Sequence, residues 1–198
     1  IQPLFSQQPA YFILGENEFE GVQIYDVIQD NDLNYWFATD QGFYKYNSYK
    51  FEKIECSDMK GLSAFGFVKN SDGIIYCYNL NSQIIKIEKD SCSIFYELKE
   101  RERASDVYLS ITANNALLVL SKTALIFDSK GKKINIESVP PSYYGFPFLT
   151  DEGITISHMS AMDSLLVIEK NKFRIVPLLT EFEKINGLLK FFEIDKLT

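Results

Sequence analysis

The sequence predicts an all-β protein, a β-propeller fragment of about four four-stranded antiparallel blades. Three observations support this prediction. Short apolar strands and polar turns recur about every 40 residues, a period typical of propeller blades. Aromatic residues make up 15% of the chain, with 16 Phe and 12 Tyr, and such residues favour pleated, half-buried surfaces. Patterns typical of amphipathic helices are scarce along the whole chain.

The chain of 198 residues opens with a short apolar run that ends in small and polar residues. Residues 1–21 are therefore expected to be an N-terminal strand or the remnant of a secretory signal. Residues 22–198 are expected to form the partial propeller. We place its blades at approximately 22–61, 62–104, 105–148 and 149–187, with the start of a fifth at 188–198. Because the last copy stops early, we expect a longer parent propeller.

The first copy of the repeat shows the pattern most clearly. Residues 22–29 alternate between apolar and polar side chains and lead into a polar turn at Asp30. Two aromatic strands follow, at 35–39 and 43–46, and a turn with Gly42 joins them. Two short strands joined by a turn that contains glycine predict a β-hairpin.

The later copies are more degenerate but keep the same order of strands and turns. The expected strands are 64–69, 74–78 and 83–87 in the second copy, 107–111, 117–120 and 124–127 in the third, and 154–157, 165–168 and 173–176 in the fourth. Their alternation is imperfect, as expected where neighbouring blades bury both faces of a sheet. Residues 98–104 are compatible with a turn of helix, but their charges favour a solvated loop between the second and third units. The Pro140-Pro141 pair indicates another loop between units.

Charge and hydropathy exclude several classes of function. The formal net charge is −7, which disfavours nucleic acid, because such binding depends on neutralising phosphates with Lys and Arg. Adsorption to an anionic membrane is disfavoured for the same reason. No apolar run approaches the roughly 20 residues that a membrane-spanning helix needs.

Metal and cofactor sites are not expected. Cys56, Cys77 and Cys92 form no C-x-x-C pair, so we expect small buried thiols in strands, with at most one disulfide. The sequence Asp30-x-Asp32-x-Asn34 opens like a calcium loop, but the glycine and glutamate that such a loop needs later are missing. We therefore expect a hairpin turn there. Glycine-rich phosphate-binding motifs are also missing.

Catalysis is not expected either. His158 is the only histidine, and no G-x-S-x-G motif accompanies it. Paired carboxylates for glycoside hydrolysis can come from distant parts of a chain. The acidic residues beside turns, such as Asp106 and Asp151, are nevertheless of the kind found on any protein surface.

The candidate site in the sequence is an aromatic cluster after the Pro140-Pro141 pair. It consists of Tyr143, Tyr144, Phe146 and Phe148. Exposed aromatic faces suit sugar or peptide binding and protein interfaces, so these four residues are predicted to contact a ligand or a partner. The alternative is that they pack one blade against the next.

The first copy resembles the two-component regulator propeller repeat. The resemblance rests on residues 24–30, on Trp36-Phe37-Ala38-Thr39, and on Gly42 with the aromatic residues after it. The later copies lack the tryptophan and the second glycine. This resemblance implies the periplasmic sensor region of a Bacteroidetes-type histidine kinase or hybrid two-component regulator, in which many such regions respond to glycans.

The expected function is therefore a non-catalytic extracytoplasmic sensor module, glycan- or nutrient-responsive, in the ectodomain of an inner-membrane protein. Its expected partners are an oligosaccharide or another small extracellular ligand, the remaining blades of the parent propeller, and a second copy in a homodimer, with no nucleic acid and no cofactor. Two alternatives stay open. One is a structural or protein-interaction propeller without a small ligand. The other is a propeller lyase or hydrolase, which would need carboxylates at a central funnel.

Overall fold

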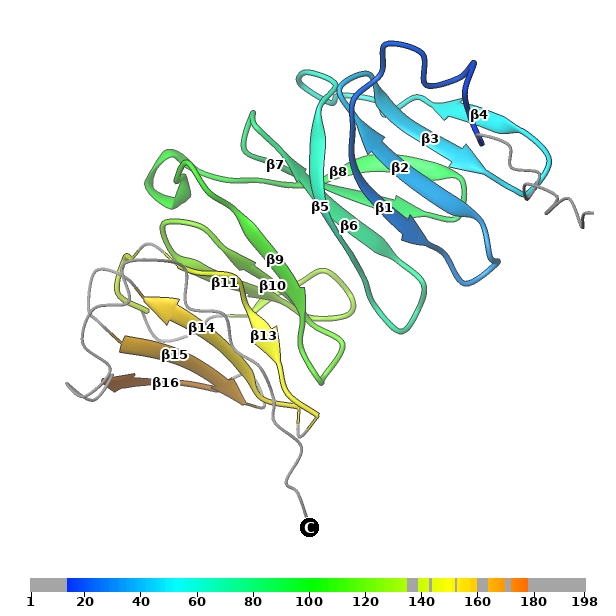
Figure 1. Ribbon diagram of the computed structural model, residues 1–198. Coiled ribbons are helices and arrows are strands. Elements are labelled where there is room, and N and C mark those ends of the chain that lie inside the picture. Colours follow the sequence, from blue (N-terminus) through cyan, green and yellow to red (C-terminus); the bar gives the residue numbers. More distant parts are fainter. Residues whose placement is uncertain are drawn as a thin grey trace, which may run out of the picture.

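The structure is a computed structural model that describes residues 14–134, 139–142, 144–151, 153–159, 164–169 and 172–177. It contains four four-stranded antiparallel sheets, each built from strands that are consecutive in the chain. The predicted all-β propeller architecture is confirmed. Figure 1 shows the sheets following one another in chain order, from the blue end to the orange end.

The strands of each sheet have the following bounds. The first sheet contains β1 (Ile24–Gln29), β2 (Tyr35–Thr39), β3 (Gly42–Tyr46) and β4 (Phe51–Ile54). The second contains β5 (Ala64–Lys69), β6 (Ile75–Asn79), β7 (Gln83–Glu88) and β8 (Ser91–Glu97). The third contains β9 (Tyr108–Ile111), β10 (Leu117–Leu120), β11 (Ala124–Phe127) and β12 (Lys133–Ile134). The fourth contains β13 (Phe148–Leu149), β14 (Thr155–Met159), β15 (Ser164–Glu169) and β16 (Lys172–Pro177).

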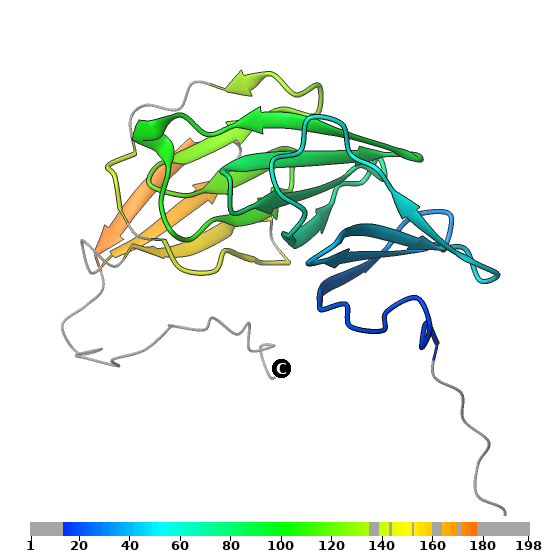
Figure 2. The ribbon, with the colours of Figure 1, turned by 90° about the horizontal axis from the view of Figure 1, so that it is seen from above.

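The first strand of each sheet lies toward the inside of the arrangement. β1 contacts β5, and β5 contacts β9, so the first strands of successive blades are neighbours, as they are around the axis of a propeller. Figure 2 shows the same succession of sheets from above. β1, β5, β9 and β13 are called the inner strands below.

Three apolar cores hold the described sheets together, and each lies between two neighbouring blades. Trp36 and Phe43 of the first blade pack with Cys77 and Ile85 of the second. A second core joins blades two and three, and a third joins blades three and four. In β10 all four residues are buried, because its two faces contribute to two different cores. This arrangement explains why polar and apolar residues alternate so poorly in the sequence.

The turn after each inner strand has the same hydrogen bonds in all four blades. The backbone N–H groups of Asp30, Asn70, Thr112 and Thr150 each donate to the carbonyl oxygen four residues later, at 2.8–3.0 Å. A side-chain oxygen of each of these residues accepts from the N–H of that same later residue. These four positions are therefore structurally equivalent, and they lie roughly 40 residues apart, as a blade period requires.

The strand order predicted for the fourth copy is wrong by one strand. Residues 154–157 were expected to be its first strand, but they belong to β14, the second strand of the fourth sheet. The first strand is β13, which contains only Phe148 and Leu149. Two residues are too few to show a period of two, so the sequence pattern passed over this strand.

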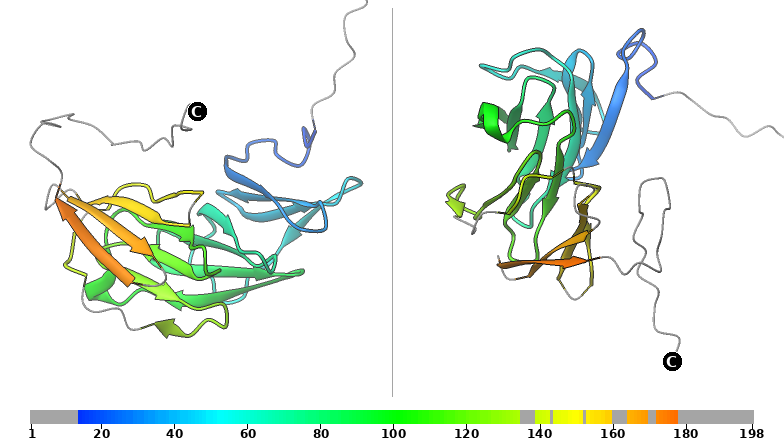
Figure 3. Two further views of the ribbon diagram at one scale, coloured as in Figure 1. Left: turned by 90° about the horizontal axis from the view of Figure 1, so that it is seen from below. Right: turned by 90° about the vertical axis from the view of Figure 1, so that its left-hand side faces the viewer.

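Two further segments differ from expectation. The charged loop at 98–104 contains a short 3-10 helix, η1 (Glu100–Glu102), and Glu102 is buried rather than solvated. Residues 14–21 form turns rather than a strand. Phe19 of this segment lies 5.0 Å from Phe37 and 5.1 Å from Phe51, measured between ring centroids, and Figure 3 shows the dark blue segment beside the first sheet. Residues 1–13 and the expected fifth copy at 188–198 lie outside the described residues.

Among the helices of the described residues, none has the length and apolar character that a bilayer crossing requires.

Candidate functional site

Aromatic side chains stand at the start of the inner strands. Tyr25 and Phe65 come five residues before the equivalent turn positions Asp30 and Asn70. Tyr108 and Phe146 come four residues before Thr112 and Thr150. Each of the four blades therefore places one aromatic ring near the same end of its inner strand. We call these residues, together with Tyr78 of β6, the aromatic rim.

The difference of one residue between the blades comes from β-bulges. The pairing of β1 with β2 shifts between Ile24 and Asp26, and the pairing of β5 with β6 shifts between Phe65 and Val68. The pairing of β9 with β10 is regular. A bulge inserts a residue and changes the direction of a side chain. In β5 the bulge leaves Phe65 paired with Tyr78, as Tyr108 pairs with Leu120 in the third blade. In β1 Tyr25 is itself the extra residue, between Ile24 and Asp26.

Tyr25, Phe65 and Tyr78 form a continuous layer across the first two blades. The centroids of the Tyr25 and Phe65 rings are 4.6 Å apart, and those of Phe65 and Tyr78 are 5.8 Å apart. Tyr25 is 37% exposed, and the other two rings are half-buried. Both pairs are tilted, with interplanar angles of 37° and 36°. Aromatic pairs in contact stabilise one another by about 0.5–1.5 kcal/mol beyond their burial, so the layer presents a firm apolar surface.

Gly66 makes this packing possible. It has a φ of +66°, and a Cβ atom there would lie 2.8 Å from Cε1 of Tyr78. Only glycine takes up such a left-handed conformation at little cost. The bulge in β5 therefore needs glycine both for its backbone conformation and for contact with the tyrosine ring.

Tyr108 and Phe146 continue the rim in blades three and four. Their ring centroids are 5.1 Å apart. Phe146 is 66% exposed, and Tyr108 is half-buried. Of the four residues predicted as ligand or interface contacts, Phe146 is thus the one with a largely exposed ring. Phe148 is half-buried in β13 and pairs with Ile156, and Tyr143 lies outside the described residues.

Tyr144 is a core residue, so the expectation that it is exposed is wrong. It is only 6% exposed and packs with Leu118, Leu120 and Met159 in the core between blades three and four. Its hydroxyl donates to the carbonyl oxygen of Pro140 at 3.0 Å, and burial raises its pKa to about 12. Tyr144 therefore packs blade three against blade four, which was the alternative prediction for this cluster.

Carboxylates lie beside the aromatic rim. Burial raises the pKa of the Tyr78 hydroxyl, with further contributions from Tyr108, Asp106 and Asp26. The pKa of Tyr108 is raised by burial and by Asp106. Both hydroxyls therefore keep their protons at neutral pH and can donate hydrogen bonds. Asp26 also accepts from the backbone N–H of Phe67 at 2.7 Å and so ties the bulge of β1 to that of β5.

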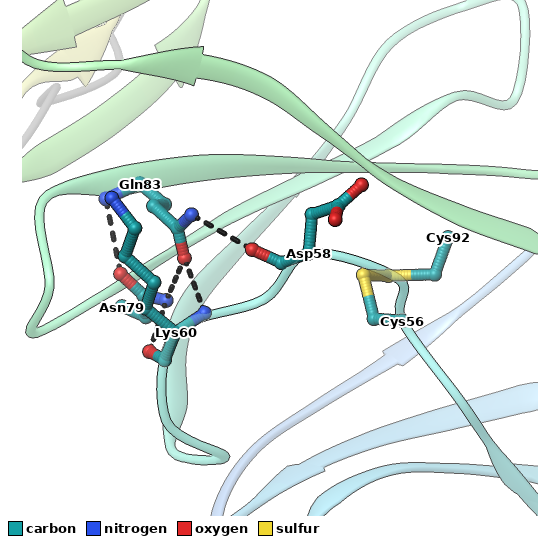
Figure 4. The surroundings of a disulfide bond; sticks show 6 residues. All are labelled: Cys56, Asp58, Lys60, Asn79, Gln83 and Cys92. Carbon is teal, nitrogen blue, oxygen red and sulfur yellow. Dashed lines mark hydrogen bonds between the residues drawn. A yellow bond between two sulfur atoms is a disulfide. The ribbon is translucent and has the colours of Figure 1, made fainter.

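A disulfide anchors the loop that leads to the rim of blade two. Cys56, between β4 and β5, is bonded to Cys92 of β8, and their Cα atoms are 4.8 Å apart (Figure 4). One disulfide agrees with the expected maximum of one. The expectation of small buried thiols in strands is wrong for this pair, because the two cysteines are bonded and Cys56 lies in a loop that folds back onto the second sheet. It holds for Cys77, which is free and fully buried.

The same loop is held by a buried amide network. Oε1 of Gln83 accepts from the backbone N–H of Lys60 at 2.7 Å, and Nε2 donates to the carbonyl oxygen of Asp58 at 3.1 Å (Figure 4). The side chain of Asn79 donates to Oε1 of Gln83 at 2.9 Å. Asn79 and Gln83 are each 2% exposed. Satisfied buried networks of this kind fix one conformation, here that of the segment just before Phe65.

The other candidate sites take structural roles. Oδ2 of Asp30 accepts from the side chains of Asn34 and Trp36, at 3.0 Å each. These donors occupy the carboxylate that a calcium loop would need, in agreement with the expected hairpin turn. His158 lies half-buried in β14, opposite Leu165. The described part of the chain shows no group of three or more His, Cys, Asp or Glu side chains suited to a metal ion.

The sequence interpretation missed most of the rim. Tyr25, Phe65, Tyr78 and Tyr108 were treated as ordinary strand residues. The signal that identifies three of them is their position relative to the turn residues Asp30, Asn70 and Thr112, once a bulge is allowed for. That alignment needs the hydrogen-bonded turns, which the sequence does not show directly.

Comparison with known proteins identifies the fold and little beyond it. No family model matches the chain, and no curated protein matches it. Among solved structures, virginiamycin B lyase from Staphylococcus aureus is similar, with a TM-score of 0.62 and 12% identity over 78% of this chain and 55% of the lyase.

Two extracellular domains from B. thetaiotaomicron are similar as well. The domain of BT3049, described as a hybrid two component system, has a TM-score of 0.57 and 13% identity over 77% of this chain and 24% of that chain. The domain of BT4673, described as a one component system, has a TM-score of 0.56 and 9% identity over 78% of this chain and 24% of that chain. The propeller fold is therefore shared with extracellular domains of one-component and two-component systems and with an enzyme.

Proposed function

We propose that this chain is part of an extracytoplasmic sensor and that it binds a ligand without catalysing a reaction. The observation that carries the proposal is the Cys56–Cys92 disulfide in a fold shared with extracellular domains of two-component systems. Structural disulfides persist in oxidising compartments and are rare in the cytosol. The periplasm and a glycan or another nutrient as ligand belong to the same proposal.

The mechanism would be a shift between two arrangements of the ectodomain. A ligand changes such an equilibrium only as far as it binds one arrangement more tightly than the other. The disulfide, the Gln83 network and the bond from Phe67 to Asp26 hold blades one and two in one geometry. Rigid blades of this kind suit a sensor, because binding energy is then not lost in local rearrangement.

The absence of catalysis is part of the proposal, because the similar structures include a lyase. A variant of that lyase in which a histidine is replaced by alanine is described as catalytically inactive. The only histidine here, His158, lies on the face of the fourth sheet opposite the core residues Ser157 and Met159. It lies beside Gly145, whose backbone N–H donates to the carbonyl oxygen of His158. None of the hydrogen bonds of the described residues joins the His158 ring to a carboxylate.

A protein-interaction scaffold is the second candidate. It is favoured by apolar side chains on the face of the first sheet that points away from the second. Val27 is 46% exposed and Tyr35 is 41% exposed on that face. Self-association that depends on concentration, together with no heat of binding for any glycan, would favour this scaffold over the sensor.

Two measurements in native cells test the sensor function. Protease added to spheroplasts should cut the protein, whereas intact cells should protect it. Alkylation of the unfolded, unreduced protein should modify Cys77 but not Cys56 and Cys92, which are held in the disulfide. Deletion of the reading frame should abolish a transcriptional response to one class of polysaccharide. A protein that is protected in spheroplasts and carries three free thiols would contradict the proposal.

A further inference from the structure

We propose that the aromatic rim binds a neutral oligosaccharide, with sugar rings stacked on aromatic rings from adjacent blades. This inference rests on the proposed sensor function and names the site and the class of ligand. The rim consists of Tyr25, Phe65, Tyr78, Tyr108 and Phe146.

The arrangement of the rim is the first argument. One ring per blade stands four or five residues before the equivalent turn position, in four consecutive blades. The rings make contacts with one another in two groups, one across blades one and two and one across blades three and four. A row of similar aromatic rings suits a ligand made of repeated units, because each sugar unit can stack on a ring in a similar way.

Exposure is the second argument. Phe146 is 66% exposed and Tyr25 is 37% exposed, although both are large apolar side chains on strands or loops next to well-packed cores. Each of these two residues is in contact with another ring of its own group, and contiguous exposed apolar surface marks an interaction site more often than scattered single residues do. The apolar faces of a sugar ring can cover these rings while its hydroxyl groups stay in contact with water.

The polar groups around the rim select a neutral ligand. Asp26 follows Tyr25 and accepts from the backbone N–H of Phe67 at 2.7 Å, and Asp106 lines a small cavity together with Tyr108. Carboxylates accept hydrogen bonds from sugar hydroxyl groups and repel uronic acids, sulfates and phosphates. The net charge of −7 acts in the same direction. A neutral glycan therefore fits better than an anionic one.

The structure also shows that the rim is a built feature. The bulge of β1 contains Tyr25, and the bulge of β5 directly follows Phe65; bulges often direct side chains toward functional sites. Gly66 admits the ring of Tyr78. The disulfide and the Gln83 network fix the loop before Phe65. A rim of this rigidity keeps the loss of side-chain entropy on binding small.

The test uses the purified chain of 198 residues and calorimetry. The probes are a panel of neutral oligosaccharides from plant and microbial polysaccharides, a matched panel of uronic-acid oligosaccharides, and a proline-rich peptide. Phe146→Ala and Tyr25→Ala should each weaken binding of the neutral ligand about 3- to 10-fold, as expected for the loss of one aromatic contact. The double variant should bind more weakly than either. Phe146→Trp should keep the affinity, since it retains a flat ring.

The matched control is Tyr49→Ala. Tyr49 is 93% exposed but lies between β3 and β4, at the opposite side of the first sheet from β1, so its loss should leave binding unchanged. Far-ultraviolet circular dichroism and the unfolding midpoint confirm that each variant is folded. Equal binding by the double variant would overturn the proposal, as would tight binding of only the anionic panel or only the peptide.

The failure of this inference can be told apart from failure of the sensor function. If cells that carry the Tyr25→Ala and Phe146→Ala double variant still respond to the polysaccharide, the rim is not the site, but the sensor function stands. If cells with the unaltered chain do not respond to any polysaccharide, the sensor function itself fails.

Discussion

The indole Nε1 of Trp36 donates a hydrogen bond of 3.0 Å to Oδ2 of Asp30. Asp30 is in the turn after the inner strand of the first blade, and Trp36 is fully buried in the core between the first two blades. This bond joins the polar turn to the apolar core. Asn70, Thr112 and Thr150 hold the equivalent turn position, so the first blade combines the shared turn with a tryptophan anchor of its own.

Replacing Asp30 by Asn should reduce the loss of stability in acid. Burial acts to raise the pKa of Asp30, but hydrogen bonds from Asn34, Trp36 and the turn backbone hold it below its ordinary value of 3.8. A lowered pKa contributes stability above the ordinary value, and this contribution disappears as the pH falls through the folded-state pKa. The free energy of unfolding, measured by urea titration between about pH 5 and 2, should therefore fall less steeply in Asp30→Asn.

The control for that measurement is Asp32→Asn, because Asp32 is an exposed carboxylate in the same turn. This variant removes the same charge from the same turn without removing the acceptor of the Trp36 and Asn34 hydrogen bonds, so it shows how much of the change in Asp30→Asn comes from charge alone. Equal pH dependence in Asp30→Asn and the unaltered protein would show that the turn carboxylate does not contribute to stability.

Reduction of the Cys56–Cys92 disulfide should destabilise the protein strongly. The bond closes a loop with a sequence separation of 36, and the chain-entropy model gives about 4 kcal/mol for a loop of this length. Thermal and urea unfolding with and without reductant measure the effect. The double variant Cys56→Ala and Cys92→Ala should unfold like the reduced protein and should not respond to reductant.

Cys77→Ala is the control for the reductant itself. Cys77 is a buried free thiol in the core between blades one and two, so its loss lowers stability, but the difference between oxidised and reduced protein should remain. An unaltered protein with the same stability in both redox states would contradict the structural role of the bond.

Gly66→Ala should destabilise the protein more than Gly21→Ala. The two glycines have nearly the same φ, +66° and +69°, so alanine brings the same backbone strain of about 1–2 kcal/mol at each. Only at Gly66 does the new methyl group meet a neighbour, Cε1 of Tyr78 at 2.8 Å, whereas Gly21 has open space. The difference between the two free energies of unfolding measures the contact with the tyrosine ring. Equal values would show that Tyr78 moves aside freely.

The sequence predicts most of the fold because the same turn chemistry recurs along it. The hairpin around Gly42 and the polar turn at Asp30 identify the first blade, and aromatic strands identify the sheets. In the fourth blade the sequence predicts β14 as the first strand and passes over β13, because β13 has only two residues and follows a segment rich in proline. Short inner strands carry too little pattern for a period to be read.

The site was harder to predict than the fold for a physical reason. Tyr144 and Phe146 stand two residues apart in one cluster, yet the first is buried in a core and the second is exposed. Exposure depends on which blade face a side chain meets, and the sequence does not contain that information locally. The sequence allows at most one disulfide but does not identify the pair, since the sequence separation between Cys56 and Cys92 does not reveal that their Cα atoms approach to 4.8 Å.

The cores shared between adjacent sheets have a consequence for how such a molecule can evolve. Trp36 of the first blade and Ile85 of the second share one core. Leu118 of the third blade and Leu166 of the fourth share another. Duplication of a whole blade would therefore keep the existing cores between neighbouring blades and would add one more core of the same type. The size of the molecule can change in steps of one blade, whereas a deletion within a blade would leave two mismatched faces.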